Sequence, residues 1–314
     1  MAVYTHVDDY MLTEFLSRYD HGEALSFKGI AEGVENSNYY LETTTSRFVL
    51  TLYEARANVE DLPYFLNMME HLSSKGVACP LPVKDKNGIA LQSLAGKPAC
   101  MITFLTGVSF TYMKPVHCSE LGKNLADIHN ALADYDANRK NTLSVDAWVE
   151  MAANLAPRAN EVETGLADMV TNEAKFLKDN WPTDLPTGTI HADLFPDNTL
   201  FTGDKLTGLI DFYFACTDFL AYDLAICLNA WCFDENQNFM APAADAMIAA
   251  YTDHHPMSDA EKAALPILCR GAALRFLLTR LHDWLNPASG AVVNLKDPKD
   301  FSRRLSFFQN KGLS

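Results

Sequence analysis

Residues 188–212 combine two short apolar runs with a polar stretch between them, and this segment constrains the fold more than any other part of the chain. The runs at 188–191 and 206–211 have the length and composition of β-strands, and they are predicted to form a short hairpin-like insert. Four polar residues belong to the same segment: His191, Asp193, Asn198 and Asp211. The fold must therefore hold a polar loop beside two short strands.

The spacing of these residues suits phosphoryl transfer. Their order is H-x-D-x-x-x-x-N, and Asp211 follows thirteen positions after Asn198. The carboxylate of Asp193 can accept a hydrogen bond from an attacking hydroxyl group, while Asn198 and Asp211 can bind the same metal against the phosphates. Such oxygen ligands suit Mg²⁺ better than zinc. The alternative is a Pro-Asp-Asn turn without function, since Asp and Asn commonly cap their own backbone.

The first third of the chain has the pattern of a small β-sheet with one helix. The predicted strands are residues 24–30, 39–43, 47–53 and 99–105. A short Thr/Ser turn joins the second and third strands, as in a hairpin. Between the strands, apolar residues recur with helical period over 61–72, where Pro63 is tolerated in the first turn.

The pattern becomes mostly helical after residue 105. Apolar residues recur at helical spacing over 121–132, and long helical patterns continue through 271–285. The sequence therefore predicts an α+β fold with two domains. Residues 1–105 form a β-rich N-terminal lobe, and residues 106–314 form a larger α-rich lobe.

The charge and the cysteines exclude several classes of function. Lysine and arginine number 25 against 40 acidic residues, and the formal net charge of −15 argues against nucleic acid and anionic lipid surfaces as partners. Charged residues interrupt the long apolar stretches, so no segment is predicted to span a membrane. The seven cysteines are scattered without a C-x-x-C pair, which predicts buried thiols rather than disulfides or a zinc site. Without a secretory signal at the N-terminus, a cytoplasmic protein is expected.

Two motifs in the polar segment carry a resemblance to a known family. His191-Ala-Asp193 with Asn198, and Ile210-Asp211-Phe212, resemble the catalytic and metal-binding signatures of the aminoglycoside phosphotransferase and choline kinase superfamily. The chain more closely resembles the bacterial homoserine kinase branch, along nearly its whole length. The stretches that carry this resemblance are 26–39, 50–54, 190–198, 209–225 and 270–280.

The resemblance implies a two-lobed, protein-kinase-like fold and a homoserine kinase activity. ATP, Mg²⁺ and L-homoserine are the implied ligands, and the O-phosphorylated product feeds threonine synthesis. Asp193 is the implied catalytic base or hydroxyl-orienting carboxylate, and Asn198 and Asp211 are the implied magnesium ligands. His191 is expected to brace the loop, and Asp223 to pin it through backbone hydrogen bonds.

The resemblance also assigns the N-terminal lobe to ATP. Gly29 and Gly33 occupy the place of a glycine-rich phosphate loop, although a plain hairpin loop is the default reading of so few glycines. Phe104 and Leu105 close the last strand where a hinge and the adenine contacts are expected.

One position departs from the family pattern. These kinases usually carry a basic residue on the third strand, paired with a helix glutamate, and here Thr51 stands in its place. Glu70 is the candidate acidic partner. Lys28 and Arg56 are the nearest basic residues that could substitute, with Arg56 slightly preferred, although an exposed surface arginine is the alternative.

The substrate is a zwitterion, and arginine suits its carboxylate because the planar guanidinium can bond both oxygens. Arg275 and Arg280 lie in the apolar helical pattern over 271–285, and Arg280 can alternatively pair with Asp283 within the helix. Residues 270–314 have eight basic and three acidic side chains, which favours this region for the carboxylate. Choline kinases carry an acidic residue just before the tryptophan matching Trp231. Here Ala230 takes that place, which shifts the balance from choline toward an amino acid.

Two other functions remain open at this point. The first is another small-molecule kinase of the superfamily, acting on an aminoglycoside, choline or a sugar. The second is a catalytically silent pseudokinase that serves as a binding module, which only Thr51 favours. The sequence leaves the oligomeric state open.

Overall fold

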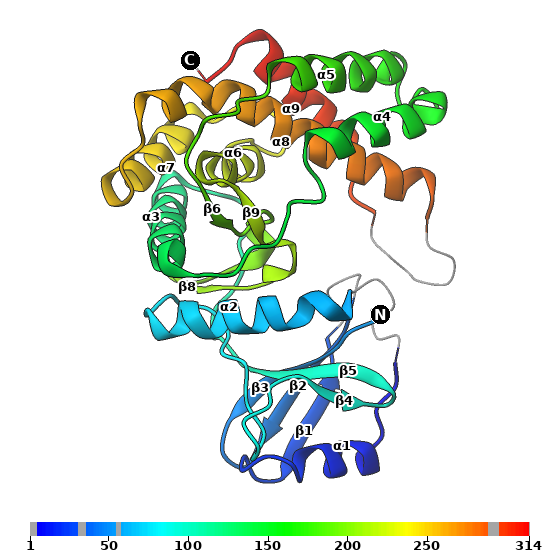
Figure 1. Ribbon diagram of the computed structural model, residues 1–314, viewed down its shortest axis with the longest axis vertical. Helices are drawn as coiled ribbons and strands as arrows, with labels where there is room; N and C mark the ends of the chain where they lie inside the picture. The colour runs from blue at the N-terminus through cyan, green and yellow to red at the C-terminus, as the bar shows by residue number, and fades with distance from the viewer. Residues whose placement is uncertain (1–4, 31–35, 55–57, 288–294, 314) are drawn as a thin grey trace. The chain divides into compact units, whose positions relative to one another are not determined.

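The computed structural model of the chain describes residues 5–30, 36–54, 58–287 and 295–313 (Figure 1). Gly33, which is predicted to belong to the phosphate loop, and Arg56, the preferred substitute for the missing basic residue, lie outside these ranges. The chain divides into two compact units, of which the first ends at Thr106 and the second begins at Gly107.

The first unit is built on a five-stranded antiparallel sheet in the order β1-β2-β3-β5-β4. Its strands are β1 (Ala24–Gly29), β2 (Ser37–Thr43), β3 (Arg47–Leu52), β4 (Gln92–Leu94) and β5 (Lys97–Thr103). The four strands predicted from the sequence are confirmed within two residues at each end. The short strand β4 was not predicted, because three residues are too few for an alternating pattern to register.

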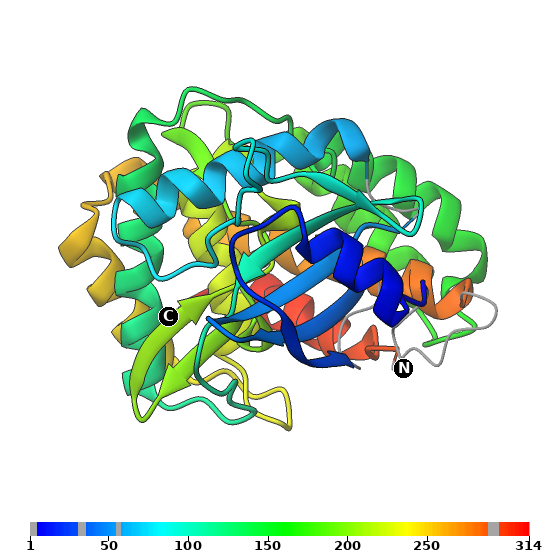
Figure 2. The ribbon, with the colours of Figure 1, turned by 90° about the horizontal axis from the view of Figure 1, so that it is seen from below.

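Two helices cover opposite faces of this sheet (Figures 1 and 2). They are α1 (Asp9–Leu16) and α2 (Leu62–Ser74), the latter preceded by a 3₁₀ turn η1 (Val59–Asp61). Leu12 and Phe15 of α1 are buried with Leu41 and Leu50 of the sheet in one hydrophobic cluster. In α2 the predicted apolar stripe is buried, with Pro63 in the first turn. Burial of these two stripes against the sheet stabilises the unit.

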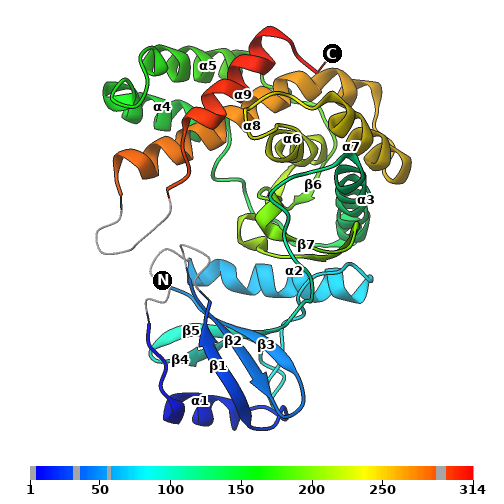
Figure 3. The same cartoon turned by 180° about the vertical axis from the view of Figure 1, so that it is seen from behind.

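The second unit is mainly helical (Figure 3). Its helices are α3 (Pro115–Ala131), α4 (Val145–Ala159), α5 (Leu166–Asn180), α6 (Leu220–Trp231), α7 (Ala241–His254), α8 (Asp259–Leu285) and α9 (Lys299–Asn310). Short 3₁₀ turns are η2 (Leu132–Asp134), η3 (Pro196–Asn198) and η4 (Phe212–Phe214). Helix α6 is buried on almost every side and packs against α3, α7 and α8. The unit therefore has a central helix that can present side chains in several directions.

Four short strands form two separate pairs in the second unit, and this corrects the prediction of a single hairpin-like insert. Strand β6 (Thr187–Ile190) pairs with β9 (Cys216–Phe219), whereas β7 (Thr199–Thr202) pairs with β8 (Lys205–Leu209). The predicted strands at 188–191 and 206–211 thus exist but lie in different sheets. The strands that they pair with are four residues long, which is too short to distinguish from the intervening loops.

The antiparallel sheet and the helical unit confirm the predicted α+β class. All seven cysteines are buried and free, as predicted. Among the described helices, none combines the length and the apolar character that crossing a bilayer requires.

Candidate active site

The predicted catalytic loop follows strand β6, and its backbone is sharply turned at Ala192. This residue has a φ of +63°, in the left-handed region that residues other than glycine seldom adopt. His191 and Ala192 are buried, and Asp193, the next residue, is partly exposed. The turn therefore delivers the Asp193 side chain from a buried backbone to an accessible position.

Asp223 in α6 holds the backbone of this turn. Its carboxylate is completely buried and accepts hydrogen bonds from the N–H groups of His191, at 2.7 Å, and Ala192, at 2.9 Å. Burial alone opposes ionisation of Asp223, yet hydrogen bonds from His129 and the backbone keep the pKa of this carboxyl below its usual value. The structure thus places Asp223 where the sequence predicted a pinning residue.

Two further residues stabilise the buried carboxylate, and sequence reasoning missed both. His129 of α3 places Nε2 3.2 Å from Oδ2 of Asp223, and its Nδ1 lies 2.8 Å from the hydroxyl oxygen of Tyr251 in α7. His129 lies in the apolar face of its helix, where a histidine gives no local sign of function. Only the packing of α3, α6 and α7 brings the three side chains together.

His191 braces the loop as a neutral imidazole. Its Nδ1 accepts a hydrogen bond from the backbone N–H of Asp193 at 3.3 Å, and its Nε2 donates to the carbonyl of Ile210 at 3.1 Å. Burial lowers the pKa of His191, which keeps the ring uncharged. The ring therefore ties the catalytic loop to the segment that leads into Asp211.

The carbonyl groups of the loop are held by side chains from two helices. Nη1 of Arg275 in α8 donates to the carbonyl of Ala192 at 2.7 Å, and the indole Nε1 of Trp231 in α6 donates to the carbonyl of Leu194 at 2.9 Å. Residues more than 30 positions away in the sequence thus fix the conformation of the loop. The sequence of the loop itself does not predict these contacts.

Asn198 contacts Asp193 directly. Its Nδ2 donates to the carbonyl of Asp193 at 2.8 Å and lies 3.2 Å from the carboxylate Oδ2. The carbonyl of Asn198 in turn accepts from the backbone N–H of Ile210 at 3.0 Å, so the loop and the strand before Asp211 are joined again. The structure therefore brings Asp193 and Asn198 together as their spacing predicted.

The carboxyl of Asp193 is poised to bind a proton near neutrality. Burial, reinforced by repulsion from Asp211, raises its pKa to about 8. The positive charges of Arg275 and Lys296 act in the opposite direction. A carboxylate with a pKa in this range can take a proton from a hydroxyl group at working pH.

Asp211 follows β8 in a strained conformation. Its φ of +65° and ψ of 63° place it in the left-handed region, and its side chain is exposed. Its negative charge helps to raise the pKa of Asp193, so the two carboxylates lie within electrostatic range of each other. Strained backbone of this kind is concentrated at functional sites, because surrounding contacts must enforce it.

Oxygen donors from Asn198 and Asp211 match the chemistry of Mg²⁺, which is bound by one or two protein carboxylates or amides and keeps other positions for water and phosphate oxygens. Among the described residues, no group of three or more His, Cys, Asp or Glu side chains is placed to hold a metal. The donor set therefore fits magnesium rather than a cage built from protein side chains alone.

Arg280 is tied to helix α9. Its Nη1 lies 3.3 Å from the carbonyl of Asp297 and 3.3 Å from Oδ2 of Asp300, and its guanidinium lies over the ring of Phe301. The intrahelical pair with Asp283 that the sequence allowed is wrong, since Asp300 is the acidic partner of Arg280. Helix α9 is distant in sequence, and only the packing of α8 on α9 reveals this partner.

In the first unit, Gly29 ends strand β1 opposite Tyr39. Thr51, at the position where relatives carry a basic residue, donates a hydrogen bond to Oδ1 of Asn38 at 2.8 Å. Glu70 forms an ion pair with Lys84. Lys84 lies in the segment after α2, so only the tertiary fold brings it to Glu70. Arg56 lies outside the described residues, so the choice of Lys28 or Arg56 as the substitute for the missing basic residue stays a prediction.

The two residues predicted as a hinge follow strand β5 directly. The backbone N–H of Phe104 donates to the carbonyl of Arg47 at 3.1 Å, and the Phe104 ring meets the edge of Tyr40. Leu105 is partly exposed. Phe104 therefore still belongs to the sheet of the first unit.

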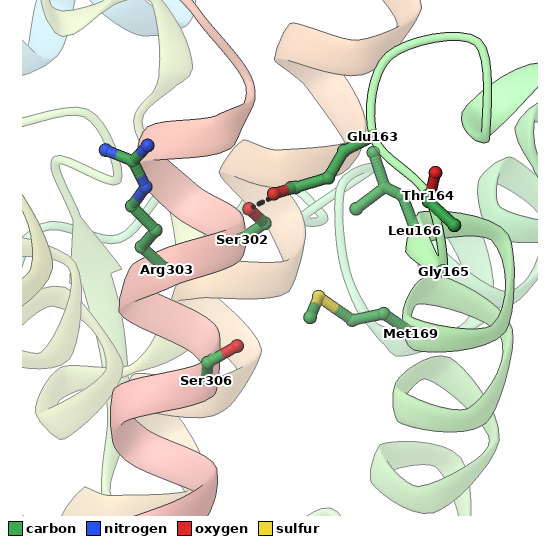
Figure 4. Close-up of a pocket in the computed structure, with 8 residues that line it drawn as sticks. All are labelled: Glu163, Thr164, Gly165, Leu166, Met169, Ser302, Arg303 and Ser306. Atoms are coloured by element: carbon green, nitrogen blue, oxygen red, sulfur yellow. Dashed lines mark hydrogen bonds between the residues drawn. The ribbon is translucent and has the colours of Figure 1, made fainter.

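A pocket of about 440 Å³ lies elsewhere in the second unit, between the α4–α5 turn and α9 (Figure 4). Glu163 and Ser302 are hydrogen bonded across it at 2.9 Å. His191, Asp193, Asn198 and Asp211 are not among the residues that line it. We do not assign this pocket to the reaction.

Sequence comparison places this chain among phosphotransferases. The sequence profile of the phosphotransferase enzyme family matches residues 26–259. The chain is 57% identical over 307 residues to a homoserine kinase of Methylobacterium radiotolerans, covering 98% of this chain and 96% of that protein. It is 53% identical over 309 residues to a homoserine kinase of Xanthobacter autotrophicus, with 98% and 96% covered.

Solved structures with a similar fold include an amicoumacin kinase and a spectinomycin phosphotransferase. The amicoumacin kinase, in complex with AMP-PNP, Ca²⁺ and Ami, superimposes with a TM-score of 0.72 at 14% identity, covering 98% of this chain and 95% of that one. A spectinomycin phosphotransferase bound to ADP and spectinomycin superimposes with a TM-score of 0.74 at 15% identity, covering 98% and 99%. At such low identity these structures establish the fold alone.

Proposed function

Because the chain belongs to the phosphotransferase enzyme family, we propose that it is a homoserine kinase, which transfers the γ-phosphate of ATP to the hydroxyl group of L-homoserine. The product is O-phospho-L-homoserine, an intermediate of threonine biosynthesis. The observation that carries the proposal is the near-full-length identity above 50% to several homoserine kinases. The geometry around Asp193 supports the same chemistry independently.

Asp193 is the residue that we assign to the hydroxyl group. Its carboxylate is partly exposed, and its pKa of about 8 allows it to accept the proton as the oxygen attacks phosphorus. The contact with Asn198 Nδ2 fixes the direction of the carboxylate. Orientation of the attacking group is a large part of catalysis in phosphoryl transfer, because little covalent chemistry is left to the protein.

Asn198 and Asp211 are the residues that we assign to magnesium. The Nδ2 atom of Asn198 serves Asp193, and the amide oxygen is therefore the atom assigned to the ion. Neutralisation of the charge that develops on the phosphates is the chemistry that a bound Mg²⁺ supplies. Gly29, Phe104 and Leu105 remain our candidates for contacts with ATP.

Arg280 is our candidate for the carboxylate of the substrate. The basic side chain is held between Asp300 and the ring of Phe301 but keeps 14% of its surface exposed. Burial lowers its pKa against the opposing charges of Asp300, Asp197 and Asp193, so it lies within electrostatic range of the catalytic loop. A guanidinium at such a place can hold one end of an amino acid.

A panel of acceptors tests the proposed function. ADP release is measured with ATP and Mg²⁺ in the presence of L-homoserine, L-serine, choline, an aminoglycoside or a sugar, and the product is identified by ³¹P NMR. We expect the highest kcat/KM with L-homoserine and none above background for Asp193→Ala. A higher kcat/KM with another acceptor would overturn the substrate while leaving the kinase assignment in place. ATP binding without ADP release on any acceptor would instead indicate a pseudokinase.

A further inference from the structure

Arg275 is a buried arginine whose positive charge acts on the carboxyl of Asp193 without a direct ion pair. Its side chain is 3% exposed, and among the ion pairs of the described residues none includes it. Its Nη1 donates a hydrogen bond to the carbonyl of Ala192 at 2.7 Å, and the hydroxyl group of Tyr222 is a second polar neighbour of the guanidinium. The ring of Phe276 lies 4.6 Å from the guanidinium carbon. Burying a charged guanidinium group costs free energy of folding. The presence of Arg275 beside the catalytic loop therefore suggests a function that offsets this cost.

Ala192 is hydrogen bonded through both its backbone N–H and its carbonyl group, and Arg275 binds the carbonyl. The N–H of Ala192 donates to the carboxylate of Asp223 at 2.9 Å, and the carbonyl of Ala192 accepts from Arg275 at 2.7 Å. A left-handed conformation is unfavourable for alanine, because its Cβ comes too close to the following carbonyl oxygen. Two charged side chains, from α6 and α8, thus enforce the turn immediately before Asp193.

We propose that Arg275 is a positioning residue for Asp193, and not the ligand of the substrate carboxylate. This inference rests on the proposed kinase function. The carbonyl that Arg275 holds belongs to the peptide unit joining Ala192 to Asp193, so the guanidinium fixes the plane from which the catalytic side chain departs. An error of about 1 Å in that position is enough to lower turnover about 10²-fold.

The environment of the guanidinium argues against a direct contact with the substrate. The Nε atom of Arg275 is buried and has no hydrogen-bond partner. By contrast, Arg270 uses Nε and Nη2 together to bind both oxygens of Glu173, each at 2.7 Å. A carboxylate could reach the corresponding edge of Arg275 only if the side chain or its neighbours moved.

Arg304 of α9 offers a matched control. It is also buried, with 8% exposed, and its Nη1 donates to a backbone carbonyl, that of Asn229, at 2.6 Å. Its guanidinium lies over the rings of Phe233 and Phe301. Both arginines are therefore buried, donate Nη1 to a backbone carbonyl and lie near phenylalanine rings. They differ in two ways: Asn229 belongs to helix α6 and not to the catalytic loop, and Nε of Arg304 also donates to Gln237 at 2.7 Å.

The first test compares the steady-state kinetics of Arg275→Met and Arg304→Met, after both have been shown to fold by thermal denaturation. We expect Arg275→Met to lower kcat about 10- to 100-fold, with KM for the acceptor and ATP changed less than about threefold. Arg304→Met should keep kcat within about twofold.

Chemical rescue gives a second test of the same role. Added guanidinium ion should restore part of kcat in Arg275→Ala. A higher KM with unchanged kcat in Arg275→Met would indicate that Arg275 binds the substrate. An equal loss of kcat in Arg304→Met would indicate that Arg275 has only a structural role. Either result would overturn the proposal.

Hydrogen–deuterium exchange gives a readout that does not depend on activity. We expect faster exchange in the peptide over 191–198 for Arg275→Met, and wild-type exchange there for Arg304→Met, since only the first loses a bond to the loop. Unchanged exchange in Arg275→Met would contradict the proposal. If the wild-type protein phosphorylates an acceptor other than homoserine, the proposed substrate fails, whereas the same comparison of kcat with that acceptor still decides the role of Arg275.

Discussion

The side-chain amide of Asn198 bonds Asp193 twice: its Nδ2 lies 2.8 Å from the main-chain oxygen of Asp193 and 3.2 Å from the carboxylate Oδ2. One end of the amide thus orients the residue assigned to the hydroxyl group. The other end carries the oxygen assigned to magnesium. A single asparagine therefore sets the geometry between the attacking group and the metal.

This relationship predicts that Asn198→Asp is inactive although it retains an oxygen ligand for Mg²⁺. The substitution replaces a donor by a carboxylate beside Oδ2 of Asp193, and two like charges at that distance repel. We expect kcat to fall at least about 10²-fold at every Mg²⁺ concentration. The measurement is a magnesium titration of ADP release, with the exposed neighbour Asp197→Asn as the control. Recovery of Asn198→Asp at high Mg²⁺ would show that ligation alone matters.

The assignment of Arg280 predicts an effect on substrate binding. Arg280→Gln removes the charge while keeping a polar side chain near Asp300, so KM for homoserine should rise about tenfold or more and KM for ATP should not. Steady-state kinetics with each substrate varied in turn measure both constants. Arg303→Gln, on the neighbouring α9, is the control. An unchanged KM for homoserine in Arg280→Gln would remove Arg280 from the substrate site.

Removal of the Asp223 carboxylate is expected to be costly for folding. In Asp223→Ala the N–H groups of His191 and Ala192, and the ring of His129, lose their acceptor inside the protein. Unsatisfied buried groups cost about 1–3 kcal/mol each, so the free energy of unfolding should fall by roughly 3 kcal/mol or more. Urea denaturation measures it, with the exposed Asp245→Ala as control. A loss below about 1 kcal/mol would show that water replaces the carboxylate.

The raised pKa of Asp193 predicts a pH-dependent stability in the absence of divalent cations. The folded protein binds this proton up to a pH of about 8, whereas an unfolded aspartate releases it near 3.9. Ionisation therefore destabilises the fold as pH rises through this window. Asp193→Asn cannot ionise, so its thermal midpoint relative to wild type should increase between pH 5 and pH 8.5. A constant difference across that range would mean that Asp193 titrates normally.

The sequence was sufficient to predict the local part of the site, and the reason is physical. Asp193 and Asn198 are five positions apart in a loop whose ends are fixed by short strands, so their contact depends on few long-range interactions. The same holds for the antiparallel sheet of the first unit, whose four longer strands are separate strand-like runs in the sequence, although only β2 alternates regularly between more and less buried positions. The family resemblance carried the function, and the comparisons confirm the family.

The supports of the loop could not be predicted in this way. His129, Trp231 and Arg275 come from three helices and reach the loop only through packing. Each of these residues lies in an apolar helical pattern. That pattern does not reveal whether the polar atom of the side chain contacts a functional loop or a neighbouring helix. The one available signal was the presence of an arginine in the apolar segment of α8. It pointed to Arg275 but suggested the substrate as its partner.

The left-handed backbone at Ala192 has a consequence for how this enzyme can be improved. Glycine adopts that conformation without strain, so Ala192→Gly should relax the turn that Asp223 and Arg275 now enforce. Selection for heat resistance acts on the balance between this relief of strain and the larger conformational entropy that glycine loses on folding, while selection for growth without supplied threonine acts on turnover. A laboratory evolution campaign would therefore have to screen turnover and thermal tolerance together at this position.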